Sequence, residues 1–153
     1  MASAKVIKAL NEARARELTA ILQYMSQHYE LADQDFVKLG DAIKKIAIVE
    51  MKHAETLAER ILFLNGVPLS QPDGKTKKGE NIPGLLATDM KLEEEAVAMY
   101  NRSSNLCAAE NDIVSKEIFD KLAQEEEDHF NYFDNTKAHV DQLGAAYLAT
   151  LAG

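Results

Sequence analysis

Two Glu-x-x-His motifs are the residues of this chain with the clearest capacity for chemistry. They lie at Glu50–His53 and at Glu126–His129. Residues three apart on a helix share a face, so each motif places a carboxylate beside an imidazole. Carboxylate oxygens and neutral imidazole nitrogens are suitable ligands for iron or manganese. One such motif alone is weak evidence, because charged helices contain it by chance.

Each motif has a further glutamate 33 residues upstream (50 − 17 and 126 − 93). These residues are Glu17 and Glu93, so the whole pattern recurs at an offset of 76 (93 − 17 and 126 − 50). The midpoint of each pair falls in a polar break, at residues 31–35 and 108–112. In an antiparallel helical hairpin, residues equidistant from the turn lie at the same height. Two hairpins packed face to face would therefore bring four glutamates and two histidines into one layer.

At these positions the chain resembles the bacterioferritin family. The resemblance is carried by residues 17–24 (ELTAILQY), 50–55 (EMKHAE), 59–66 (ERILFLNG) and 89–93 (DMKLE), and it extends over nearly the whole chain. It implies an all-α fold: a ferritin-like four-helix bundle with one long crossover and a short fifth C-terminal helix. We therefore expect a single domain over residues 1–153.

The resemblance also implies an activity and its ligands. The expected activity is that of a ferroxidase, which oxidises Fe(II) to Fe(III) with O₂ or H₂O₂ and stores ferric mineral in a hollow shell. Two iron ions are expected per subunit. Glu17 and His53 would be terminal ligands of one ion, Glu93 and His129 of the other, and Glu50 and Glu126 would bridge. Periodicity alone does not exclude Glu125 in place of Glu126, but the 33-residue spacing and the resemblance both favour Glu126.

Met51 follows Glu50 directly and is therefore rotated about 100° away from the metal layer. On sequence alone it reads as an apolar gap-filler. The resemblance instead implies a haem axial ligand, with one haem shared between two subunits across a two-fold axis. By the same resemblance the partners are further copies of the chain, in a shell of 24 subunits built from two-fold dimers, and a ferredoxin-type electron donor.

Composition excludes several other classes of protein. The chain has 153 residues, enough for one domain with a substantial core. Its net charge of −8 argues against binding to nucleic acid or to an anionic membrane surface. No apolar run approaches the roughly 20 residues that span a bilayer, and residues 1–8 contain no apolar signal-peptide core. Cys107 is the single cysteine, so we expect a reducing, cytoplasmic setting.

Apolar periodicity predicts four long helices and a C-terminal one. Their expected bounds are about Ser3–Leu31, Asp35–Asn65, Ile82–Ala109 and Asp112–His139, followed by a short helix within Gln142–Leu151. Residues 67–83 carry three prolines and two glycines and lack a helical pattern. Extended at about 3.3 Å per residue, this segment reaches roughly 50 Å, and a thirty-residue helix is about 45 Å long. It is therefore long enough to make the second and third helices run in the same direction.

The sequence leaves two other functional interpretations to consider, and it differs from some bacterioferritins at two positions. A rubrerythrin-like di-iron peroxidase without iron storage shares the ligand pattern, but the Cys-x-x-Cys electron-supply module of such proteins requires more than one cysteine. A plain helical scaffold, whose buried carboxylates pair with lysines, predicts a monomer that takes up no metal. Burying four carboxylates without a metal or another cation is costly, which argues against it. Lys45 and Val49 stand where some bacterioferritins carry a histidine and an acidic residue for an extra, cavity-side iron.

Overall fold

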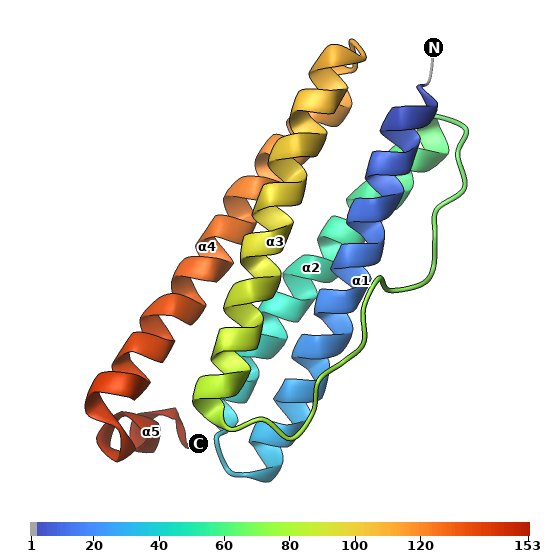
Figure 1. Ribbon diagram of the computed structural model, residues 1–153. Coiled ribbons are helices and arrows are strands. Elements are labelled where there is room, and N and C mark those ends of the chain that lie inside the picture. The colour runs from blue at the N-terminus through green and yellow to red at the C-terminus, as the bar shows by residue number, and fades with distance from the viewer. Residues whose placement is uncertain (1–2) are drawn as a thin grey trace.

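The computed structural model describes residues 3–153, which form five α-helices and, within that range, no strand. They are α1 (Ala4–Asp33), α2 (Val37–Phe63), α3 (Ile82–Ala109), α4 (Ile113–Leu143) and α5 (Ala145–Leu151). α1 and α2 form one antiparallel hairpin, α3 and α4 form a second, and the two hairpins lie side by side (Figure 1). The predicted all-α four-helix bundle with a short fifth helix is confirmed. Residues 1 and 2 of the expected domain lie outside the described residues.

The first three helices end in the same way, at an Asp or Asn with a left-handed backbone. The following residue then donates its N–H to the carbonyl five residues back, which satisfies a helix-end acceptor. The left-handed residues are Asp35 (φ 65°), Asn65 (φ 65°) and Asn111 (φ 59°), and the bonds run from Phe36 to Leu31 (2.9 Å), from Gly66 to Ile61 (2.8 Å) and from Asp112 to Cys107 (2.8 Å). The second helix is therefore shorter than predicted at both ends, because Asp35 and Asn65 belong to these turns.

The predicted end of the fourth helix at His139 is wrong. α4 continues to Leu143, since Val140 is buried and extends the apolar face by one more turn. The helix ends at Gly144, whose φ of 55° suits a residue without a Cβ. His139 is no helix cap: its Nδ1 lies 2.7 Å from the carbonyl oxygen of Asn135, and its ring stacks on Tyr147.

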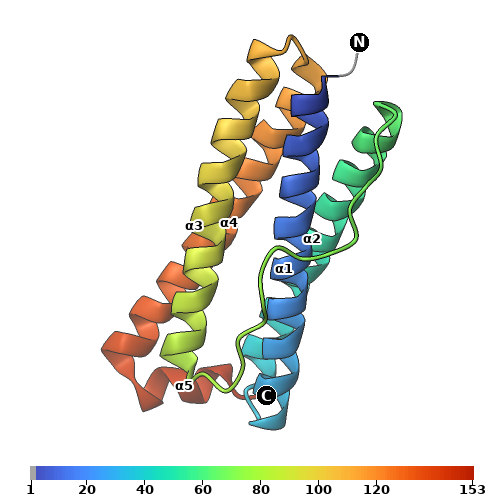
Figure 2. The same ribbon diagram turned by 45° about the vertical axis from the view of Figure 1, so that its right-hand side comes forward.

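The segment 64–81 is the long crossover, and it makes α2 and α3 parallel, as predicted (Figure 2). It descends beside α1, held by α1 side chains that bond to its backbone. The bonds include Arg14 Nε to Leu69 O (2.7 Å), Gln23 Nε2 to Lys77 O (2.9 Å) and the N–H of Gly79 to Glu30 Oε2 (2.9 Å). These bonds order a segment that has no regular structure of its own.

The bundle core consists of two hydrophobic clusters, one on either side of the carboxylate layer. One cluster contains Tyr24, Ile43 and Phe133, and the other contains Leu57, Tyr100 and Phe119. Both glutamates of the first hairpin lie between the clusters in sequence, Glu17 on α1 and Glu50 on α2. The apolar clusters therefore enclose the polar layer and keep it from water.

α2 also has an apolar face that points away from the bundle. Met51 is 46% exposed, and Ile48, three residues before it, lies on the same face. Leu62, eleven residues or about three turns after Met51, is 59% exposed on that face too. Together with the buried residues that face the core, these side chains make the helix apolar most of the way round. None of the helices in residues 3–153 has an apolar stretch long enough to cross a membrane.

Candidate metal centre

All six predicted ligands lie in one layer at the middle of the bundle. α1 contributes Glu17, α2 contributes Glu50 and His53, α3 contributes Glu93, and α4 contributes Glu126 and His129. The four carboxylates are at most 1% exposed. The hairpin geometry expected from the 33-residue spacing therefore brings together the residues that it predicted.

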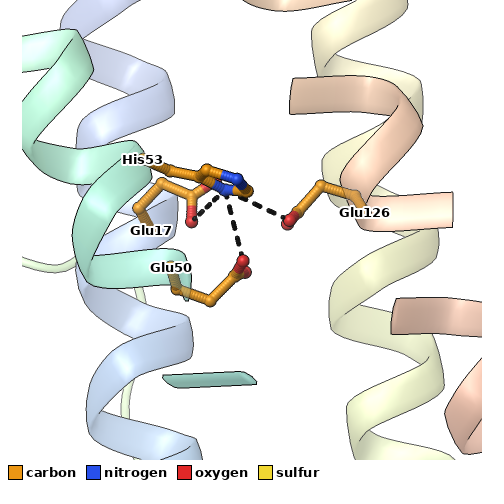
Figure 3. Close-up of side chains that lie close together, drawn as sticks. All are labelled: Glu17, Glu50, His53 and Glu126. Atoms are coloured by element: carbon orange, nitrogen blue, oxygen red, sulfur yellow. Dashed lines mark ion pairs between the residues drawn. The ribbon is translucent and has the colours of Figure 1, made fainter. Parts of the chain in front are cut away.

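The first half of the layer surrounds the inner nitrogen of His53. Its Nδ1 lies 3.5 Å from Glu17 Oε2, 3.3 Å from Glu50 Oε1 and 3.3 Å from Glu126 Oε1. Figure 3 shows the three carboxylates converging on the ring, with Glu126 reaching across from the other hairpin. One ligand atom from each of the four residues fits within 4.8 Å of the others, the spacing of donors around one cation.

The second half repeats this arrangement around His129. Its Nδ1 lies 3.6 Å from Glu93 Oε2, 3.3 Å from Glu50 Oε1 and 3.3 Å from Glu126 Oε1. Glu50 and Glu126 belong to both groups of four. The layer therefore offers two adjacent positions, each with one histidine, one carboxylate of its own and two shared carboxylates.

The atoms that face this space lack hydrogen-bond partners within the described chain. They are Glu17 Oε2, both carboxylate oxygens of Glu50, His53 Nδ1, Glu93 Oε2, Glu126 Oε1 and His129 Nδ1. A buried polar atom without a partner costs roughly 1–3 kcal/mol. Seven such atoms aimed at one space form a donor set that could hold metal ions, and their oxygen and nitrogen chemistry suits iron, manganese or zinc.

Burial and the neighbouring charges together displace the pKa values in the layer. Burial raises the pKa of Glu50 to about 7, and the charges of Glu17 and Glu93 add to the effect. Burial and the charge of Glu126 raise the pKa of Glu93 to about 8. Burial lowers the pKa of His129, but the neighbouring carboxylates outweigh it and raise that pKa to about 12. The metal-free layer therefore binds protons that a cation must displace.

Two tyrosines join the layer, and Tyr100 was not among the residues singled out from the sequence. Tyr24 donates to Glu93 Oε1 at 2.5 Å, and Tyr100 donates to Glu17 Oε1. Each hydroxyl thus crosses between the hairpins to hold the outer oxygen of a terminal glutamate. The signal for Tyr100 was present: it follows Tyr24 by 76 residues (100 − 24), the same offset that relates the ligands.

Other residues singled out in the sequence lie away from the layer. Met51 is on the outer face of α2, and Lys45 is exposed on the same helix. Glu125 is outside the layer and contacts the outer nitrogen of His53, so Glu126 is the α4 glutamate that faces the other ligands. Val49 lines a groove of about 340 Å³, together with His53 and Glu125.

Four helices with one long crossover, enclosing a layer of four glutamates and two histidines, define a ferritin-like protein with a candidate centre for two metal ions. The family described as Ferritin-like domain matches residues 7–143. Individual proteins with similar sequences identify the family more narrowly. A bacterioferritin of Desulfovibrio desulfuricans is 43% identical over 98% of this chain and 84% of its own length. Bacterioferritins of Brucella melitensis and Rhodobacter capsulatus are each 36% identical, covering 92% and 97% of this chain and 87% and 92% of their own. The chain belongs to the bacterioferritin family.

A solved structure agrees with this assignment. The X-ray structure of the Desulfovibrio desulfuricans bacterioferritin superposes with a TM-score of 0.96 and covers 98% of this chain and 88% of that one. That structure is described with its diiron site in different catalytic states. The family membership and the fold inferred from the ligand pattern are thus both confirmed.

Proposed function

We propose that this protein oxidises ferrous iron at the six-residue layer and stores the ferric product within a shell of its own copies. The observation that carries the proposal is the set of seven buried, partnerless oxygen and nitrogen atoms directed at one space. The similarity to a bacterioferritin with a described diiron site supports iron as the metal.

Two ferrous ions are the substrate, and the residues divide between them by distance. Glu17 and His53 hold one ion, Glu93 and His129 hold the other, and Glu50 and Glu126 bridge. Four carboxylates balance the charge of two divalent ions. Oxidation to the ferric state adds two positive charges to a layer built for neutrality, which favours release of the product.

The electrons and protons balance with either oxidant. Two ferrous ions give one electron each to O₂, which takes up two protons and becomes hydrogen peroxide. With hydrogen peroxide as the oxidant, the same two electrons and two protons break the O–O bond and give two waters. The enclosing apolar clusters exclude bulk water from the layer.

The chain's own contribution is to exchange protons for ferrous ions. With a pKa of about 8, Glu93 is largely protonated at pH 7 in the metal-free protein. Ferrous binding displaces that proton and those on the histidines, so uptake strengthens as the pH rises. Tyr24 and Tyr100 keep the outer oxygens of Glu93 and Glu17 occupied, which leaves the inner oxygens for the ions.

The exposed apolar face of α2 suits a two-fold contact between copies of the chain. Met51 lies on this face, so a two-fold axis beside it would bring two thioethers together as axial ligands of one haem. Such a haem would pass electrons inward from a ferredoxin-type donor for reductive release of iron. Assembly into 24 subunits in the cytoplasm completes the proposal.

Stopped-flow oxidation of ferrous iron tests the centre. Glu17→Ala and His129→Ala each remove one terminal ligand, so the fast phase should disappear while the assembled mass stays unchanged. Wild-type rates in both variants would refute the assignment. The storage part is tested by native mass: the shell should elute at many times 17.0 kDa and hold a ferric core. A protein that remains monomeric or dimeric in all salt and pH conditions would defeat the shell but not the metal centre.

A further inference from the structure

The metal layer has an almost exact internal two-fold symmetry. The distance from histidine to terminal glutamate is 3.5 Å in one half and 3.6 Å in the other, and all four distances from histidine to shared glutamate are 3.3 Å. The tyrosines obey the same symmetry. On these contacts alone, the two metal positions should bind equally well.

One contact breaks the symmetry. Glu125 Oε2 contacts Nε2 of His53, the ring nitrogen that faces away from the layer. The residue related to Glu125 by the offset of 76 is Val49 (125 − 76), which has no acceptor to offer His129. His53 therefore has a carboxylate at its outer nitrogen, whereas the residue that the internal repeat makes equivalent to Glu125 on the His129 side is a valine.

The contact decides which ring nitrogen carries a proton. A histidine that binds metal through Nδ1 must present a lone pair there, so its proton must be on Nε2. A carboxylate that accepts the Nε2–H fixes this tautomer, orients the ring and makes Nδ1 a stronger donor. The side chain of Glu125 is 35% exposed and that of His53 only 5%, so the acceptor reaches inward from the groove between α2 and α4 to a buried ring.

We propose that Glu125 is a positioning residue for His53 and makes the Glu17–His53 position bind metal more tightly than the Glu93–His129 position. This inference rests on the proposed metal-binding function and deepens it. Its consequence is an order of filling: the first ferrous ion occupies the Glu17–His53 position, and the second completes the pair across the shared carboxylates.

Anaerobic titration of the metal-free assembled protein with Co²⁺ tests the proposal, because Co²⁺ has visible ligand-field bands and is not oxidised. Wild type should fill in two resolved steps. Glu125→Ala should weaken the first step by about 10- to 100-fold, the usual effect of losing an outer partner of a metal-bound histidine. Glu125→Gln should restore most of the affinity, because its amide oxygen still accepts the Nε2–H. The matched control is Glu127→Ala, which removes an exposed carboxylate from the same helix.

Three further variants test the difference in affinity between the two metal positions. Val49→Glu supplies the acceptor that His129 lacks, so the second step should strengthen and approach the first. His53→Ala should abolish the tight step and His129→Ala the weak one, which assigns the steps to positions.

The outcomes separate this inference from the function on which it rests. A wild-type protein that takes up no cobalt overturns the metal centre itself. If wild type takes up two ions and Glu125→Ala titrates like Glu127→Ala, only the role of Glu125 fails. If the Ala and Gln variants both lose one ion outright, Glu125 is a direct ligand and the positioning role is wrong.

Discussion

Glu50→Gln should stabilise the metal-free protein and destabilise the metal-bound one. Glu50 is fully buried and is shared by both metal positions. In the folded, metal-free protein its pKa is about 7, against an ordinary value of 4.5, because burial opposes its charge. The folded state therefore holds this proton more tightly than the unfolded chain does. The resulting stability is present below pH 4.5 and is lost as the pH rises through about 7.

The size of the effect follows from those two pKa values. One pKa unit corresponds to about 1.4 kcal/mol, so the full cost of ionising Glu50 above pH 7 is about 3 kcal/mol. Glutamine has nearly the same shape and cannot ionise. At pH 8 the free energy of unfolding should therefore rise in the variant. The rise should be about 1–3 kcal/mol, because the histidines lose part of their favourable contact with the Glu50 carboxylate and this offsets some of the gain. At pH 5 the gain should fall below about 1 kcal/mol, because wild-type Glu50 is then protonated.

Bound metal should reverse the order of stability. A ligand at 100 times its dissociation constant stabilises by about 2.7 kcal/mol per site, and Glu50 serves both sites. Urea unfolding of wild type and variant, at pH 5 and pH 8 with and without Co²⁺ and at equal subunit concentration, measures all four cases. Glu55→Gln, an exposed carboxylate on the same helix, is the control. A variant that is less stable than wild type at pH 8 without metal, or equally stabilised by metal, would refute the reasoning.

Three further variants test separate parts of the structure. Met51→Leu keeps the volume of an exposed apolar residue, so the protein should assemble and oxidise iron normally but lack a bis-methionine haem spectrum; a retained spectrum would reduce Met51 to interface packing. Gly66→Ala places a Cβ 2.8 Å from Ile7 Cγ2 and 2.9 Å from Ile61 Cγ2, and denaturant unfolding should show a loss of about 1–3 kcal/mol; an unchanged midpoint would contradict this packing. Tyr100→Phe removes a buried donor to a carboxylate and should cost about 1.5–3 kcal/mol in the metal-free protein, with two Co²⁺ ions still bound; loss of one ion would make the tyrosine essential to binding.

The ligand layer was predictable from the sequence because helices impose a simple geometry. Equal spacing from a turn places two residues at equal height, so Glu17, Glu50 and His53 follow from counting alone. The same counting applied to tyrosines would have found Tyr100, since it repeats Tyr24 at the offset of the ligands.

The helix ends were less predictable, for a physical reason. A left-handed Asp or Asn follows the ends of α1 and α2 in the role of a glycine, and composition does not reveal that conformation. At the end of α4 the burial of Val140, a tertiary contact, carried the helix past His139. The contact between Glu125 and His53 depends on how closely α2 and α4 approach each other, which no spacing along one helix specifies.

In the proposed function, six residues of one chain hold two iron ions side by side. Anomalous X-ray diffraction at the iron edge, from crystals loaded with ferrous iron without oxygen, would locate these ions. Two peaks per subunit are expected, one beside Glu17 and His53 and the other beside Glu93 and His129, with Glu50 and Glu126 between them. A layer without peaks, or iron bound only on the surface of the subunit, would contradict the proposed function.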